Sequence, residues 1–204
     1  MYGDTSGTTL EEVNANINDS TIKTYLENWY QEHLSNYESY IADSGFCNDR
    51  TLSTTYNNGD GVNTDRTTYY ASFQRHYDAN SLTLVCPNAS NDLFTVTNES
   101  GNQAASSPIG LITMDELVYA GFRNGFINKL TYAYSNSGYL TFSPRLFSVA
   151  NNRANIFVLG GDGNLGDASS ADSIGIRPVI NLNANVEITG GIGTKSEPFI
   201  VKTT

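Results

Sequence analysis

A single long amphipathic helix near the start of the chain, followed only by short apolar runs, constrains the fold most. Between residues 19 and 34 the apolar side chains recur with the i, i+3, i+4, i+7 spacing of one buried helix face. These side chains are Ile22, Tyr25, Leu26, Trp29, Tyr30 and Leu34. Asp19 or Ser20 is the expected N-cap, and Trp29 is expected to anchor the helix on a sheet. Residues 1–18 are expected to form an N-terminal extension or a short helix.

Beyond residue 80 the apolar runs are short and separated by turn residues, which is typical of strands. The expected strands are 81–86, 93–97, 139–142, 155–159, 176–182 and 198–202. Pro178 is expected at an edge or bulge, because it lacks an N–H group. Thr113 and Glu116 have the spacing of a capping box, and Gly121 is placed to end that short helix. Helices before strands, without β–α–β alternation, predict an α+β fold with an antiparallel sheet in one domain over 19–204.

Charged residues are few and mostly acidic, and this argues against several classes of protein. The 204 residues include 11 Lys+Arg against 21 Asp+Glu, a net charge of −10, with 24 Asn, 18 Gly and 13 Tyr. Nucleic-acid binding is not expected, because neutralising phosphates requires clustered cations. Membrane insertion by this chain is not expected either, because no apolar run approaches about 18 residues. Loops rich in Tyr, Asn, Ser and Gly are typical of binding surfaces, and equally of loop-rich exported domains.

The segment GDGNLG at 161–166 matches the phosphate-binding pattern G-x-G-x-x-G. That mechanism requires a helix that begins at the phosphate, whereas the residues that follow are few, polar and acidic. A hairpin or loop tip is therefore favoured, and no cofactor is expected. The oxygens of Asp162, Asn164, Asp167 and Asp172 leave Ca²⁺ open as an alternative, although the spacing of a calcium loop is incomplete.

No pattern of catalytic residues stands out. The chain lacks G-x-S-x-G, and its two histidines, His33 and His76, do not have metal-binding spacing. No catalytic residue and no metal site are therefore predicted. An enzyme remains the competing class, for example a hydrolase acting on cell-wall or dietary glycans through His76 and a nearby carboxylate.

The two cysteines, Cys47 and Cys86, are either unrelated buried thiols or one disulfide. Two thiols alone cannot hold zinc, and a disulfide here would close a loop of about 40 residues. The acidic, Lys-poor composition resembles that of exported proteins, which favours the disulfide. We therefore expect an extracellular or cell-surface protein. No secretion signal is found before residue 30, so this expectation requires that a leader or anchor is absent from this sequence; a cytosolic protein is the alternative.

An ordered set of strings resembles a family of exported domains in gut Firmicutes and related bacteria. The strings are FCNDR at 46–50, LVCPN at 84–88, GLITMDE at 110–116, LTFSP at 140–144, GIRPVINL at 175–182 and GGIGT at 190–194. GIRPVINL is also similar to the final core strands of C-type lectin-like domains. The resemblance implies helices packed on a small twisted antiparallel sheet, long loops that form the binding face, and one disulfide.

The resemblance implies no particular activity. The Glu-Pro-Asn sugar and calcium signature of animal lectins is absent, because Phe199 follows Glu197 and Pro198. The C-terminal cysteine pair of formylglycine-generating enzymes is absent too. These departures argue against calcium-dependent sugar binding and against that oxidase chemistry.

The expected ligand face is the segment between residues 143 and 175, where the resemblance places variable loops; a solvated connector is the alternative. Its polar side chains are Arg145, Asn151, Asn152, Arg153, Asn155, Asp162, Asn164 and Asp167. A second possible face lies within 56–80, around Tyr69, Tyr70 and His76. Arg177, between apolar neighbours, is expected to form a structural ion pair.

Together these patterns predict a cell-surface or secreted ligand-binding module for a glycan or a surface protein. A glycan- or cell-wall-acting hydrolase and a structural subunit of a surface fibre are the alternatives. No oligomeric state is predicted.

Overall fold

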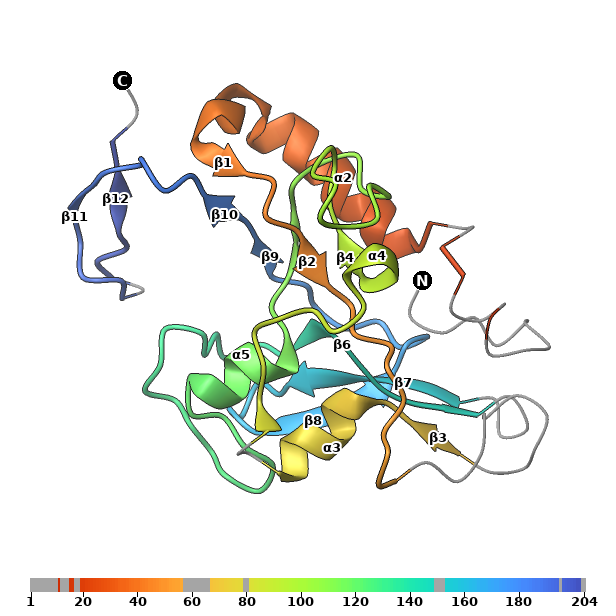
Figure 1. Cartoon of the computed structure of the whole chain (residues 1–204). Coiled ribbons are helices and arrows are strands. Elements are labelled where there is room, and N and C mark those ends of the chain that lie inside the picture. Colours follow the sequence, from red (N-terminus) through yellow and green to blue (C-terminus); the bar gives the residue numbers. More distant parts are fainter. Residues whose placement is uncertain are drawn as a thin grey trace.

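A computed structural model describes residues 11, 15–16, 19–56, 67–78, 81–148, 153–194 and 196–202 (Figure 1). The helices are α2 (Thr21–His33), the 3-10 helix η1 (Ser35–Tyr40), α3 (Ala71–Tyr77), α4 (Ala89–Asp92) and α5 (Met114–Tyr119). The longer strands are β6 (Tyr139–Ser148), β7 (Arg153–Leu159) and β8 (Leu165–Ser169). The short strands are β1 (Ile41–Ala42), β2 (Phe46–Cys47), β3 (Thr68–Tyr69), β4 (Leu93–Phe94), β5 (Gly110–Leu111), β9 (Pro178–Val179), β10 (Asn181–Leu182), β11 (Ile188–Gly190) and β12 (Ile200–Val201). The predicted α+β class is confirmed.

The central sheet has four antiparallel strands in the order β3-β6-β7-β8. The prediction of loops between 143 and 175 is wrong for most of that segment, because β6 continues to Ser148 and β7 and β8 follow; the strand expected at 155–159 is confirmed within β7. Pro144 lies within β6, where the register with β7 shifts. A bulge tolerates the missing N–H of proline, so the strand continues through it.

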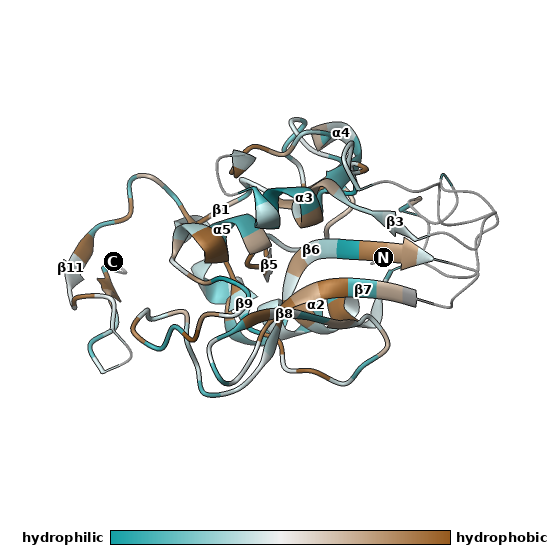
Figure 2. Ribbon diagram, turned by 90° about the horizontal axis from the view of Figure 1, so that it is seen from below, coloured by the Kyte–Doolittle hydropathy of each residue, from teal (hydrophilic) through white to brown (hydrophobic). Residues whose placement is uncertain are grey.

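The central sheet is covered by helices on both faces, because successive side chains of β7 point to opposite sides. Ile156 belongs to a cluster with Leu26 and Tyr30 of α2. Phe157 and Leu159 belong to a second cluster, with side chains of α3 and α5. Figure 2 shows α3 and α5 on one side of β6, with hydrophobic colour along β7.

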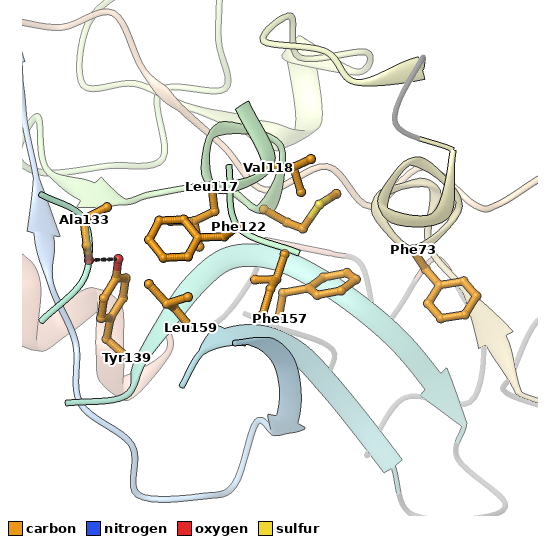
Figure 3. Packing of buried hydrophobic residues seen from close by; sticks show 10 residues of the cluster. Phe73, Leu117, Val118, Phe122, Ala133, Tyr139, Phe157 and Leu159 are labelled. Atoms are coloured by element: carbon orange, nitrogen blue, oxygen red, sulfur yellow. Dashed lines mark hydrogen bonds between the residues drawn. The ribbon is translucent and has the colours of Figure 1, made fainter. Parts of the chain in front are cut away.

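The second cluster contains the largest set of buried side chains among the described residues. It consists of Phe73, Met114, Leu117, Val118, Phe122, Ala133, Tyr139, Phe157, Leu159 and Leu165. Figure 3 shows Leu117 and Phe122 facing Leu159, with Phe157 beyond them. The same view shows Tyr139 donating a hydrogen bond of 2.7 Å to the carbonyl oxygen of Ala133.

The first long helix forms as its pattern predicts, and all of the predicted apolar side chains except Tyr25 pack in or against its core cluster. Ser20 is the N-cap, and its side chain accepts a hydrogen bond from the N–H of Lys23. Tyr30 is only 1% exposed, whereas Tyr25 is 56% exposed and does not pack on the sheet as predicted. Trp29 is only partly buried and stacks on His33 at 4.8 Å between ring centroids.

The caps of α5 are confirmed. The Thr113 side chain accepts a hydrogen bond from the N–H of Glu116, whose carboxylate accepts one from the N–H of Thr113. Gly121 has a φ of +90° just after the helix. Its N–H donates to Val118 O, and the N–H of Phe122 donates to Leu117 O, the paired bonds of a Schellman motif. This motif turns the Phe122 ring into the core.

Several predicted strands are shorter than expected or missing. Residues 81–86 are not a strand, and the side chains of Leu84 and Val85 are exposed. This apolar run finds no partner strand; the disulfide between Cys86 and Cys47 holds it instead. Only Leu93–Phe94 of 93–97 and Ile200–Val201 of 198–202 are strand. The run at 176–182 divides into β9 and β10, with Pro178 in the two-stranded pair β5-β9.

The predicted disulfide is confirmed. The Cα atoms of Cys47 and Cys86 lie 5.5 Å apart and their sulfur atoms are bonded. Cys47 is the last residue of β2, and Cys86 lies in the segment that leads into α4, so the disulfide joins β2 to that segment.

The C-terminal hairpin of β11 and β12 stands to one side of the central sheet in both views (Figures 1 and 2). No helix within the described ranges is long and apolar enough to cross a bilayer.

Candidate functional site

The predicted ligand residues lie at two separate ends of the β7–β8 hairpin. Arg145, Asn155 and Asp167 meet on the sheet: Arg145 Nε lies 3.3 Å from one Asp167 carboxylate oxygen, and Asn155 donates to the other at 2.6 Å. Asp162 and Asn164 lie in the hairpin turn instead, where Asp162 accepts a hydrogen bond from the N–H of Asn164. Asn151, Asn152 and the side chain of Arg153 lie outside the described residues.

The segment GDGNLG is the turn of this hairpin, as favoured above over a nucleotide site. The N–H of Gly160 donates to Asn164 O at 2.8 Å, and Gly163 has a φ of +88°. The side chain of Asn164 accepts a hydrogen bond from the N–H of Gly125. Among the residues that the structure describes, no three His, Cys, Asp or Glu are grouped to hold a metal ion.

The alternative face, around Tyr69, Tyr70 and His76, is largely committed to packing. Tyr70 is 2% exposed, and its burial raises its pKa well above the ordinary value. The His76 ring lies 5.2 Å from that of Phe157, and burial, with the nearby charge of Arg145, lowers the pKa of His76. His76 packs against the rings of Tyr77 and Phe157, and its Nδ1 is buried without a hydrogen-bond partner among the described residues.

A cleft of about 440 Å³ beside the disulfide is the place where acidic groups converge. Asp49 and Asp115 line it, together with buried Arg75. Arg75 donates two hydrogen bonds to Asp115, at 2.8 and 2.9 Å, and one to Asp49 at 2.8 Å. Burial alone would lower the pKa of Arg75, but the two carboxylates outweigh burial and raise it.

The other contacts of these carboxylates are to backbone. Asp115 also accepts a hydrogen bond from the N–H of Thr83, and Asp49 accepts one from the N–H of Thr51. General acid–base catalysis needs a carboxyl group that can exchange a proton with substrate. These two are held by Arg75 and by backbone, so the cluster ties α3, α5 and the loop after β2 together.

A groove lined by tyrosines offers exposed binding groups instead. Two hollows, of about 620 and 460 Å³, share Tyr132, Tyr134 and Thr194. We call them together the tyrosine groove; the other lining residues are Lys129, Leu130, Thr131, Ser135, Ser137, Gly138, Tyr139, Gly175, Ile176, Arg177, Ser196 and Pro198. One wall is the loop before β6, and the other includes the tip of the β11–β12 hairpin, on the same side of the molecule in Figure 1.

Arg177 fixes the loop wall of the tyrosine groove. Its Nη1 donates to Ala133 O at 2.7 Å, and both Nη atoms lie 3.2 Å from Tyr132 O. Its guanidinium carbon also lies 5.1 Å from the Tyr132 ring centroid and 5.8 Å from that of Tyr139. In the described part of the chain Arg177 forms no ion pair, so that prediction is wrong: carbonyl oxygens and ring faces take the place of a carboxylate.

The mouth of the groove presents an aromatic ring to solvent. Tyr132 is 69% exposed although its carbonyl oxygen is held by Arg177. Lys129 lies beside it, with Nζ 5.7 Å from the centroid of the Tyr134 ring. Sequence reasoning missed this site, although the string KLTYAYSNSGY at 129–139 has the Tyr, Ser and Asn content typical of binding loops.

Comparison with known proteins adds no assignment. No protein-family model, curated protein or solved structure matches this chain.

Proposed function

We propose that the protein is a secreted or cell-surface module that binds a glycan in the tyrosine groove. The observation that carries this proposal is an exposed Tyr132 ring at the mouth of the groove, in a residue whose backbone carbonyl is held by Arg177. A sugar ring presents a face of C–H groups, which suits the electron-rich face of an aromatic ring. Thr131, Ser135 and Thr194 supply hydroxyl groups for its hydroxyls.

Preorganisation supports binding at this place. Arg177 and the hydrogen bond from Tyr139 both hold Ala133 O, and Tyr134 donates to Gly161 O at 3.2 Å. A loop that is already ordered loses little conformational freedom when a ligand binds. The proposal includes no catalytic step.

The location and fold in the proposal rest on further observations. A disulfide persists in oxidising compartments, which supports a secreted or surface protein. A C-type lectin-like fold is part of the proposal, supported by the GIRPVINL string and by helices on both faces of an antiparallel sheet.

A glycan array tests this function. The parent chain and Tyr132→Ala would be applied to printed plant, host and bacterial oligosaccharides. Tyr25→Ala is the matched control, because Tyr25 is also an exposed tyrosine but lies on α2. We expect the parent and the control to retain the same glycans, and Tyr132→Ala to bind them about tenfold more weakly.

Two results would contradict the proposal. Retention of no glycan by the parent would exclude glycan binding and leave a protein ligand as the alternative. Equal binding by the parent and Tyr132→Ala would place the site outside the tyrosine groove.

A further inference from the structure

We infer that the glycan is acidic, with a carboxylate or sulfate group bound by Lys129 and Arg177; this inference rests on the proposed function. Both cations line the groove. No Asp or Glu is among its described lining residues, although the chain has 21 acidic residues and only 11 Lys and Arg. Glu197, between two lining residues in sequence, is exposed and does not line the groove.

Five other described cations are ion-paired with Asp or Glu: Lys23, Arg50, Arg75, Arg145 and Lys202. Arg123 also has no ion pair among the described residues, but it does not line the groove. Lys129 and Arg177 have no carboxylate partner within the described ranges; they contact tyrosine rings, and Arg177 also contacts carbonyl oxygens. Cations that no protein carboxylate neutralises can pair with an anionic ligand.

Their position relative to the rings indicates how such a ligand would bind. The Arg177 guanidinium lies over the Tyr132 ring, and the Lys129 ammonium lies over the Tyr134 ring. A sugar stacked on the exposed face of Tyr132 lies in the same groove as both cations, so an acidic substituent that extends past the edge of the ring can reach one of them. In a chain with a net charge of −10, an anion is repelled over most of the surface and attracted where cations gather without acids.

The test uses acidic glycans and uncharged counterparts with the same sugar backbone. The array would carry each uronic-acid oligosaccharide beside its methyl ester, and each sulfated oligosaccharide beside its desulfated form. We expect retention of acidic members and about tenfold weaker binding of their counterparts. A difference in affinity only within the uronic-acid pairs would indicate a carboxylate ligand, and a difference only within the sulfated pairs would indicate a sulfate ligand.

Charge variants test the role of the groove. Lys129→Gln is expected to weaken binding of a retained acidic glycan about three- to fivefold in calorimetric titration, without changing the affinity for its uncharged counterpart. Lys202→Gln is the matched control, because Lys202 is an exposed lysine paired with Glu187. Its affinity is expected to equal that of the parent.

The failures of the two proposals are distinguishable. Equal affinity for charged and uncharged members, with loss of binding in Tyr132→Ala, would overturn the acidic ligand and retain the glycan-binding groove. Equal weakening by Lys129→Gln and Lys202→Gln would overturn the role of Lys129. Binding of acidic glycans that is unaffected by Tyr132→Ala would overturn both proposals.

Discussion

The carboxylate of Asp43 closes the loop that follows β4. It accepts hydrogen bonds from the backbone N–H groups of Val96, Thr97 and Asn98. Partial burial alone would raise the pKa of Asp43, but these three hydrogen bonds outweigh burial and lower it. Three converging N–H groups form a small anion-binding nest, and the protein fills it with its own side chain.

Asp43→Asn is expected to lower the free energy of unfolding at pH 7 by about 1 kcal/mol, at the low end for charged hydrogen bonds because the site is partly exposed. A carboxyl group whose pKa is lowered by folding stabilises the protein above its unfolded pKa. That stabilisation is lost as the pH falls through the folded pKa. Urea unfolding of both chains from pH 7 to acid measures this difference. If the difference in unfolding free energy between the parent and Asp43→Asn grows as the pH falls, the proposed role of the Asp43 carboxylate is contradicted.

At the scale of the helix, α2 is held to the sheet by Tyr30 more than by Trp29. Tyr30→Ala is expected to cost about 3–5 kcal/mol of unfolding free energy, because the whole ring is buried. Trp29→Ala is expected to cost about half as much, because that ring is partly exposed. Thermal and urea unfolding measure both values.

Tyr30→Phe is the matched control for this comparison. The Tyr30 hydroxyl is buried without a hydrogen-bond partner among the described residues, so its removal is expected to change stability by less than about 1 kcal/mol. Equal losses in Tyr30→Ala and Trp29→Ala would contradict the larger contribution expected of Tyr30.

Elements defined by local chemistry were predictable from the sequence. The N-cap at Ser20 and the capping box of Thr113 and Glu116 depend on residues three apart, so sequence spacing indicates them. Whether residues 81–86 and 143–148 form strands depended instead on partners that are distant in sequence. The first found no partner strand, and the second found one in β7 despite Pro144.

The candidate site could not be predicted from sequence patterns, because it also depends on contacts between residues that are distant in sequence. The loop at 129–139, Arg177 just before β9 and the hairpin tip around Thr194 are distant in sequence, and only the fold brings them together. Arg145 and Asp167 were predicted to face a ligand, and in the structure they pair with each other across the sheet. Sequence alone could not show this pairing, because the two residues lie on different strands.

At the scale of the whole molecule, the disulfide closes a loop that includes β3 and α3. Cys47→Ser with Cys86→Ser is expected to lower the free energy of unfolding by about 4 kcal/mol, because the open chain gains conformational freedom when unfolded. Urea unfolding of the parent with and without reductant should reproduce the value. An unchanged midpoint would show that the core alone holds this loop.

The central claim is that ligand binds the tyrosine groove on an otherwise acidic molecule. Hydrogen exchange of the parent, measured with and without a glycan retained on the array, tests it most directly. The account predicts slower exchange of backbone amides in 129–139, 175–177 and 192–197, and no change in 165–169. Protection confined to the strands around Arg145, Asn155 and Asp167, with none in 129–139, would contradict it.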